Sequence, residues 1–342
     1  MHEIVVSFDV GGTNSRARIA TLAGGGATTP VGADIAARGA SASEFYDFVS
    51  RVVEAATAHG TVVSAVVAMA GMVDGDCGNI TNWPSDTLVE VSRLSGCGLP
   101  LGRTSLVNDV VAGVWGAWAR VDAGTSTVLP GRAGSGDRTA PELGAGNIVY
   151  LAPGTGLGTA GLVRHGLGSL GASTVACETQ HVPMPRLGGE IAQIVDILES
   201  TLGRPLDWED LISGRGLVHI YEAQRSIAAA MSPVGAVGDA LGAEAIALAA
   251  RAGDTLALAA VDAFYRTLGH YAQMLALTFL PCAAVVIGGA TTEHNLALLQ
   301  RGAFAEAFAA HRHFGDALGV IPVHTVGGEV NLEGGIWLAA HA

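Results

Sequence analysis

The sequence of 342 residues contains no lysine, and all 18 of its basic residues are arginines. Without lysine the chain has no Walker-type phosphate loop, no strand lysine of the protein-kinase type and no Schiff-base lysine. The 31 acidic residues outnumber the arginines and give a formal net charge of −13. We therefore expect no nucleic-acid partner, since such a partner requires a basic stripe or patch.

Cysteine is scarce, and long apolar runs are absent. The four cysteines are far apart in the sequence, which fits neither a disulfide framework nor a zinc site and indicates a reducing compartment. No apolar run reaches about 18 residues, so we expect no membrane span. The first nine residues carry acids and no basic leader, which argues against a signal peptide. These features together predict a cytoplasmic protein without a membrane partner.

Apolar residues and glycine are abundant. Hydrophobic residues make up 49% of the chain and charged residues only 14%, so large buried cores are expected. The length fits two domains at about 150 residues each. The 48 glycines cluster between apolar runs, as is typical where a backbone turns tightly or approaches a ligand.

One pattern occurs twice: an apolar strand, a glycine turn and a second apolar strand. Residues 4–10 and 16–22 flank Gly11-Gly12, and residues 147–152 and 159–163 flank a turn at 153–158. Two similar halves facing each other would place the two turns across one cleft. The sequence therefore predicts a duplicated α/β architecture.

The remaining periodicity predicts further strands and several long helices. We expect strands at 61–69, 106–108, 283–287 and 319–324, and helices at 43–59, 109–118 and from 334 onward. Helical periodicity also dominates over 189–202, 215–231 and 241–280, and within the last range residues 255–280 read as an amphipathic packing helix.

The glycine turns are candidate phosphate-binding sites. Consecutive backbone N–H groups at such a bend bind phosphate oxygens without any lysine. Asp9 lies where a carboxylate could hold hydrated magnesium, Thr13 and Thr155 offer hydroxyl donors, and Asn14 offers an amide. The alternative is that each turn is an ordinary glycine hairpin.

Two similar phosphate-binding motifs are excluded. Residues 156–161 match the dinucleotide fingerprint, but the segment after the turn reads as a strand, whereas that fingerprint needs a helix. The protein-kinase glycine loop needs a lysine on a later strand, and the chain has none.

Five segments, taken in order, resemble the bacterial hexokinase-type glucokinases over nearly the whole chain. They are Phe8-Asp-Val-Gly-Gly-Thr-Asn14, Leu106-Val-Asn-Asp109, Ala152-Pro-Gly-Thr-Gly-Leu-Gly158, Leu211-Ile-Ser-Gly-Arg-Gly-Leu-Val218 and Ile287-Gly-Gly289. The related repressor and kinase group carries a clustered-cysteine zinc motif, which this chain lacks.

The resemblance implies a two-domain actin-like ATPase (ribonuclease-H-like) fold with an interdomain cleft. The small α/β domain would comprise residues 1–107 and 315–342, and the large one residues 108–314. It also implies ATP and Mg²⁺ as cofactors, with Asp9 toward the metal. The nucleotide-binding residues would be Asp9, Gly11, Gly12, Thr13, Asn14, Gly154, Thr155, Gly156, Gly158, Gly288 and Gly289.

Asp109 is the candidate catalytic base, and Asn108 beside it is a candidate sugar ligand. Phosphoryl transfer to a sugar hydroxyl needs a carboxylate that accepts its proton. Taken alone, Asp109 would be a helix N-cap, since it lies at a strand-to-helix junction. The resemblance favours the catalytic role, because the matching Asn-Asp pair holds the sugar in that family.

Four further residues resemble sugar-binding positions. Glu178 and His181 match a Glu-x-x-His element, although the family usually has glycines where this chain has Thr179 and Gln180. The alternatives are a surface charge with a partly buried histidine, or a zinc site with Cys177. Glu209 matches a third acid, which in isolation would be a solvated helix residue. Asn82 resembles a residue of a pocket-lining loop.

These residues predict an ATP-dependent glucokinase that phosphorylates D-glucose at its 6-hydroxyl. The expected partners are a hexose and ATP, and we expect a homodimer. The alternatives are a kinase for another hexose or an amino sugar, and a nucleotide-bound sugar sensor without turnover.

Overall fold

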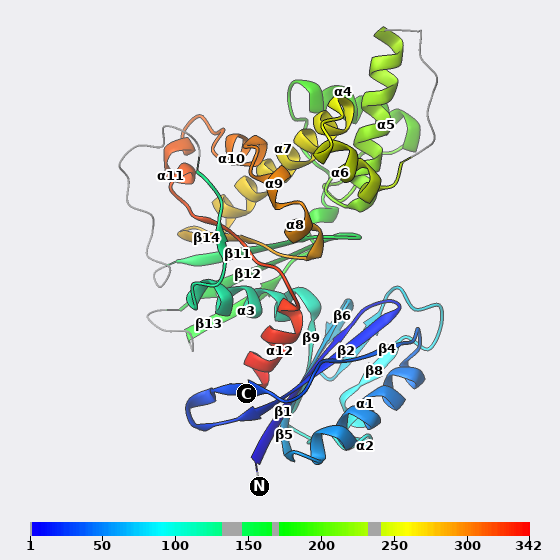
Figure 1. Ribbon diagram of the computed structural model, residues 1–342, viewed down its shortest axis with the longest axis vertical. Helices are drawn as coiled ribbons and strands as arrows, with labels where there is room; N and C mark the ends of the chain where they lie inside the picture. The colour runs from blue at the N-terminus through cyan, green and yellow to red at the C-terminus, as the bar shows by residue number, and fades with distance from the viewer. Residues whose placement is uncertain (1, 132–145, 166–170, 232–240) are drawn as a thin grey trace. The chain divides into compact units, whose positions relative to one another are not determined.

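The computed structural model describes residues 2–131, 146–165, 171–231 and 241–342 (Figure 1). Its contacts divide the chain into two compact units, residues 1–124 with 329–342 and residues 125–328. The sequence puts the domain boundaries at 107 and 315. In the compact units, residues 108–124 group with the N-terminal part and residues 315–328 with the middle part.

The first unit is built on a mixed sheet with the strand order β3-β2-β1-β5-β9, and β4 also pairs with β2. The predicted hairpin is confirmed, because β1 and β2 are antiparallel on either side of the glycine turn. Strands β5 and β9 then run parallel to β1. The bounds are β1 His2–Val10, β2 Asn14–Leu22, β3 Thr28–Pro30, β4 Ile35–Arg38, β5 Gly60–Met69 and β9 Thr104–Asn108.

Alternating side chains of β1 serve two separate cores. Phe8 packs edge-on against Phe45 and Phe48 of α1 (Ala42–Thr57), with ring centroids 5.9 and 6.1 Å apart. Val5 points to the other face and packs with Ile336 of α12 (Val330–Ala340). Because strand side chains alternate between faces, α1 and α12 cover opposite sides of the sheet (Figure 1). Helix α2 (Val91–Gly96), the 3₁₀ turn η1 (Gly24–Gly26) and a small sheet of β6 (Gly71–Asp74), β7 (Cys77–Ile80) and β8 (Leu88–Glu90) complete this unit.

Helices α3 (Asp109–Asp122) and α12 cross at glycines. A Cβ atom on Gly116 would lie 2.0 Å from the Val330 carbonyl oxygen, and one on Gly334 would lie 1.7 Å from the Ala112 carbonyl oxygen. The rings of Trp115 and Trp337 stack beside the crossing, 3.9 Å apart. Only glycine permits backbones to approach so closely, so this contact fixes α3 and the residues at its start.

The second unit repeats the strand order of the first. Its sheet runs β10-β15-β14-β11-β12-β13, with β11, β12 and β13 antiparallel and β14 and β15 parallel to β11. A hairpin followed by two parallel strands therefore occurs in both units, which confirms the predicted duplication. The bounds are β10 Thr127–Val128, β11 Asn147–Pro153, β12 Leu157–Arg164, β13 Ala172–Ala176, β14 Cys282–Ile287 and β15 Val323–Thr325.

The core of the second unit lies between this sheet and a group of helices. Val149, Leu151 and Ile287 from the sheet pack into one apolar cluster with Tyr271 and Leu275 of α7. The helices are α4 Glu190–Leu202, α5 Gly214–Met231, α6 Ala243–Arg251, α7 Thr255–Thr278, α8 Ala290–His294, α9 Leu296–Leu299, α10 Ala303–Phe308 and α11 Gly315–Gly319, with a 3₁₀ turn η4 at Thr179–His181.

The helical periodicity predicted over 241–280 contains two helices, and the packing helix predicted from residue 255 is confirmed as α7. Gly253 adopts a φ of +92°, and Asp254 caps α7 by accepting from the Ala257 N–H at 2.8 Å. Two other predicted elements are wrong in extent. The strand expected at 319–324 is confined to β15, since α11 occupies the residues up to Gly319. Helix α12 begins at Val330, four residues before the expected start.

Across the described ranges, none of the helices combines the length and the apolar character needed to cross a membrane. All four cysteines are free thiols.

The helix crossing predicts the effect of one added methyl group. Gly334→Ala should lower the free energy of unfolding by about 1–3 kcal/mol, because the new Cβ meets the backbone of α3. Gly96→Ala is the control, since a Cβ at the end of α2 meets nothing within 4 Å. Urea denaturation followed by circular dichroism measures both. Equal stability of Gly334→Ala and the unchanged protein would contradict the close crossing.

Candidate active site

The glycine turn of the first unit joins β1 to β2. The Gly11 N–H donates to the Asn14 carbonyl oxygen at 2.9 Å, and the Asn14 amide donates to Thr13 Oγ1 at 3.2 Å. A Cβ on Gly12 would lie 2.8 Å from Cβ of Asn82. The structure therefore places Asn82, predicted as a sugar ligand, directly against the predicted phosphate turn.

Asp9 lies at the end of β1, just before this turn. Its Oδ1 accepts from Asn331 Nδ2 on α12 at 3.2 Å, and Arg16, its partner across the hairpin, forms an ion pair with Glu329. Burial raises the pKa of the Asp9 carboxyl, while Asn331 and Arg16 oppose that rise and Glu329 adds to it. Burial therefore disfavours the ionised form of this carboxyl relative to water, and the Asn331 amide partly compensates.

Asp9 fits a magnesium site of the kind that relies on substrate phosphate. Mg²⁺ is commonly held by one or two carboxylates and completes its octahedron with water and phosphate oxygens. No group of three or more His, Cys, Asp or Glu side chains arranged for a metal occurs in the described part of the chain. A single partly buried carboxylate beside a phosphate turn fits a Mg²⁺ ion that takes its other ligands from water and phosphate, and does not fit a site built only from protein ligands.

Asn108 and Asp109 lie where β9 passes into α3. Asn108 is the N-cap, since its Oδ1 accepts from the Val110 N–H at 3.0 Å while its Nδ2 donates to the Gly71 carbonyl oxygen at 3.0 Å. Asp109 is the first helical residue, and its Oδ1 also accepts from the Val110 N–H, at 2.9 Å. The cap therefore belongs to Asn108, and the half-buried Asp109 carboxylate lies at the positive end of the α3 dipole.

The second glycine turn, Pro153–Gly158, joins β11 to β12. The Gly154 N–H donates to the Gly156 carbonyl oxygen at 2.8 Å, and the Gly154 carbonyl oxygen accepts from the Gly214 N–H at 2.8 Å. The start of α5 is thus tied to the turn. Thr155 is exposed at its tip, as a hydroxyl donor for a ligand would be.

Glu209 connects this turn to the predicted sugar residues. Its Oε2 accepts from the Leu157 N–H at 2.9 Å, and its Oε1 pairs with Arg215 Nη2 at 3.2 Å. Its side chain is only 17% exposed, so the alternative of a solvated helix acid is wrong. A Cβ on Gly156 would lie 2.6 Å from the Glu209 carboxylate, which explains the glycine at that position.

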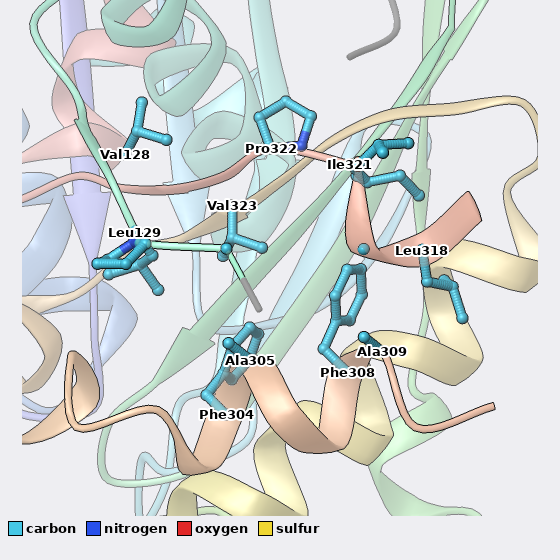
Figure 2. A pocket seen from close by; sticks show the side chains of 14 residues that line it. Val128, Leu129, Phe304, Ala305, Phe308, Ala309, Leu318, Ile321, Pro322 and Val323 are labelled. Carbon is cyan, nitrogen blue, oxygen red and sulfur yellow. The ribbon is translucent and has the colours of Figure 1, made fainter. Parts of the chain in front are cut away.

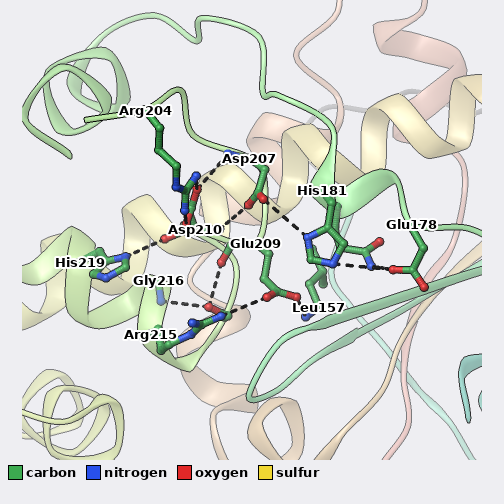
Figure 3. A network of polar contacts seen from close by, with 12 residues as sticks. Leu157, Glu178, His181, Arg204, Asp207, Glu209, Asp210, Arg215, Gly216 and His219 are labelled. Carbon is green, nitrogen blue, oxygen red and sulfur yellow. Dashed lines mark hydrogen bonds and ion pairs between the residues drawn. The ribbon is translucent and has the colours of Figure 1, made fainter. Parts of the chain in front are cut away.

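Glu178 and His181 lie together on the η4 turn (Figure 3). His181 Nε2 is 3.7 Å from Glu178 Oε2, and His181 Nδ1 is 3.5 Å from Asp207 Oδ2. Sequence reasoning missed Asp207 as a site residue, since it reads only as one member of a charged cluster. The zinc alternative finds no support among the described residues, because Cys177 Sγ lies against Thr159 and Thr179 instead.

A cavity of about 460 Å³ opens beside the second glycine turn, within the second unit. Its volume is typical of a small-molecule site. Arg251 lies on its wall and donates to Asn295 Oδ1 at 2.6 Å. Its apolar lining includes Leu217, Ala247, Val261, Phe264, Tyr265 and Leu298. Helical periodicity alone marked these residues as packing positions, so the sequence did not reveal the cavity.

Gly288 and Gly289 follow β14 and adjoin the turn without lining this cavity. The Gly288 N–H donates to the Leu151 carbonyl oxygen at 2.8 Å. A Cβ on Gly289, which has a φ of +95°, would lie 3.4 Å from the Pro153 carbonyl oxygen. The two glycines therefore contact the backbone that leads into the turn, and nucleotide binding by them stays a prediction.

A second hollow of about 170 Å³ lies between β15, α10 and α11 (Figure 2). Phe304, Phe308, Leu318 and Ile321 line it, and its described lining consists of apolar, glycine and proline residues. Without a polar group to orient a ligand, it does not compete with the larger cavity as a substrate site.

Two α/β units with the same strand order, each with a glycine turn after its first strand, define the two-domain actin-like ATPase fold. The family model described as Glucokinase matches residues 6–341, so the chain belongs to the glucokinase family.

Individual relatives agree with this assignment. The chain is 31% identical to a glucokinase of Mesorhizobium japonicum over 325 residues, which cover 93% of this chain and 86% of the relative. A glucokinase crystal structure from an Antarctic psychrotroph superposes with a TM-score of 0.79 at 22% identity and covers 100% of both chains. Glucokinase from Balamuthia mandrillaris in complex with glucose gives 0.78 at 22% identity, covering 100% of this chain and 94% of the other.

The raised pKa of Asp9 predicts how stability depends on pH. A folded-state pKa above the unfolded value of about 3.9 makes the folded protein bind the proton more tightly. That stability is fully present below the unfolded pKa and is lost as the pH rises through the folded pKa. Asp9→Asn, which keeps an acceptor for Asn331, should therefore be more stable than the unchanged protein at pH 7.

This advantage should shrink toward zero as the pH falls below the unfolded value of about 3.9, where residue 9 is uncharged in both proteins. The measurement is urea denaturation of both proteins across this range, without nucleotide or metal. A variant that is equally or less stable at pH 7 would contradict a raised pKa of the buried Asp9 carboxyl.

Proposed function

We propose that the protein transfers the terminal phosphoryl group of ATP to the 6-hydroxyl of D-glucose, giving ADP and glucose 6-phosphate. One observation carries the proposal: Glu209 accepts from the backbone of the Gly154–Gly158 turn, and its own N–H donates to the Gln180 carbonyl oxygen between Glu178 and His181. Glu209 thus links the glycine turn, which is suited to binding phosphate, to the Glu178–His181 turn, which is suited to binding sugar hydroxyls.

The larger cavity supports a nucleotide as the donor. A purine base would occupy the apolar space between α6 and α7, and its phosphates would follow Gly154 and Thr155. Backbone N–H groups at such turns bind phosphate oxygens. Because the chain contains no lysine, the donors to the phosphates at this turn would be its amides and Thr155.

Asp9 and Asn331 would hold Mg²⁺ on the first glycine turn, Asp9 as a ligand and Asn331 as the donor that orients it. When bound, the metal would neutralise charge on the phosphate oxygens. Gly11, Gly12, Thr13 and Asn14 would supply backbone and side-chain donors to the same phosphates.

Asp109 would accept the proton of the 6-hydroxyl. Its position at the α3 N-terminus stabilises the ionised form, which is the form a base requires. The Asn108 amide already accepts one hydrogen bond as the cap of α3 and donates one to Gly71. It would contact the sugar through its second N–H and the second lone pair of its oxygen.

We further propose a cytoplasmic homodimer, on the resemblance to the family. Light scattering after size-exclusion chromatography measures the oligomeric state directly.

The role of Asp109 is tested by removing its charge. Asp109→Asn should lower kcat for glucose by about 10²–10⁴-fold, because proton transfer by a positioned carboxylate is lost. Glucose binding, measured by isothermal titration calorimetry, should be retained. Asp122→Asn, at the exposed far end of the same helix, is the control and should keep full turnover.

Coupled ADP release with glucose is the readout. Unchanged turnover in Asp109→Asn would remove this residue from the mechanism. Sugar binding by the unchanged protein without ADP release with any hexose would favour a nucleotide-bound sugar sensor. Turnover of another sugar in place of glucose would favour a kinase for another hexose or an amino sugar.

The donor cavity is tested by filling it. Ala243 lines the cavity at the start of α6, close to Gly214, which is bonded to the turn. Ala243→Leu should raise KM for ATP by about tenfold, the equivalent of about 1.4 kcal/mol, and leave KM for glucose unchanged. Ala245→Leu on the same helix does not line the cavity and is the control. Equal ATP kinetics in both variants would place the nucleotide elsewhere.

A further inference from the structure

Gln180 is the buried residue of the otherwise exposed Glu178–His181 turn. Its side chain is 4% exposed, whereas those of Glu178 and His181 are 69% and 51% exposed. A glutamine is seldom buried to this degree without a reason, because burial removes its amide from water. The residues beneath the turn give that reason.

Gln180 holds the Glu178 carboxylate. Its Nε2 donates to Glu178 Oε2, and the carbonyl oxygen of its backbone accepts from the Glu209 N–H at 3.2 Å. Gln180 therefore contacts two of the three sugar-binding residues predicted in the second unit, the side chain of Glu178 and the backbone of Glu209. His181, the third, follows Gln180 directly in the chain.

The turn under Gln180 is fixed to the core by its other neighbour. Thr179 Oγ1 and Tyr271 OH are 2.7 Å apart, and the same Tyr271 hydroxyl lies 3.1 Å from Thr159 Oγ1 on β12. Burial raises the pKa of Tyr271 to about 12, so its hydroxyl keeps its proton and remains a donor. The backbone at residues 179 and 180 is thus held in place, and this fixes the position from which the Gln180 side chain extends.

While Nε2 of Gln180 contacts Glu178, the buried amide oxygen Oε1 is left without a hydrogen-bond partner among the described residues. The opposite amide orientation would put this carbonyl oxygen against the Glu178 carboxylate, which repels it. An unsatisfied buried acceptor is costly, so the bond to a charged carboxylate is the gain that offsets it.

We propose that Gln180 is a positioning residue that sets the sugar specificity of the active site. Its amide occupies Glu178 Oε2 and fixes the plane of that carboxylate, so that Glu178 Oε1 is presented to one hydroxyl of the sugar. The inference rests on the proposed glucokinase function. Positions 179 and 180 are those at which this chain departs from the glycines of the resembling family.

The test replaces the amide by an apolar group of similar size. Gln180→Leu should raise KM for glucose by about tenfold, as expected when a hydrogen bond to a charged group is lost, and should leave kcat and KM for ATP within about twofold. Gln180→Met, which also lacks the amide, serves as a second variant should the first not fold. Coupled ADP release at saturating ATP measures these constants.

Gln224→Leu is a closely matched control. Gln224 is 5% exposed, donates through Nε2 to Glu190 Oε1 at 2.6 Å and also has a buried Oε1 without a partner among the described residues. Its replacement should affect thermal stability much as Gln180→Leu does and leave every kinetic constant unchanged. Equal KM increases in the two variants would mean that Gln180 has only a structural role.

Deoxy sugars identify the hydroxyl concerned. With 1-, 2- and 3-deoxyglucose as substrates, Gln180→Leu and Glu178→Gln should lose their effect on the same single sugar. In a double-mutant cycle with glucose, the two substitutions should be non-additive, because one acts through the other. Additive effects, or an equal penalty on all sugars, would overturn the proposal.

The outcome for the unchanged protein separates the two levels of the account. Absence of glucose-dependent ADP release from it would overturn the proposed function. Normal release from it, with an unchanged KM in Gln180→Leu, would overturn the positioning role alone.

Discussion

The close crossing of α3 and α12 is the contact on which the first unit depends. Gly116 and Gly334 bring the two backbones within a distance that no other residue permits. Helix α12 also carries Asn331 to Asp9, and Glu333 to Arg120 with two contacts of 2.7 Å. The candidate base at the start of α3 and the candidate metal ligand on β1 are therefore supported by one helix, from the last fifteen residues of the chain.

In the second unit, Glu209 is the residue that connects the candidate site residues to one another. Its carboxylate is shared between the backbone of a glycine turn and Arg215, and its N–H reaches the turn that bears Glu178 and His181. An acid in this position cannot be moved without disturbing both neighbours. In a chain with no lysine, backbone amides and a few arginines must balance such carboxylates, and these are the partners that Glu209 has.

The hairpins, their glycine turns and the strand-to-helix junction at Asn108 were predictable, because apolar runs broken by glycine and a capping residue are local signals. The start of a helix at residue 255 was predictable too, and the structure adds its cause, a positive φ at Gly253 and the Asp254 cap. The cavity between α6 and α7 and the contact of Asp207 with His181 join residues far apart in sequence. Gln180 appeared in the sequence only as a departure from a motif, and its burial beneath Glu178 required coordinates.

Identification of the product tests the central claim most directly. The protein, ATP, Mg²⁺ and glucose would be incubated together and the product analysed by phosphorus–proton correlation NMR, with 6-deoxyglucose in a parallel reaction. The account predicts a phosphomonoester coupled to the protons on carbon 6, and 6-deoxyglucose as a competitive inhibitor that is not phosphorylated. A phosphoryl group on another carbon, or no phosphorylated sugar at all, would contradict it.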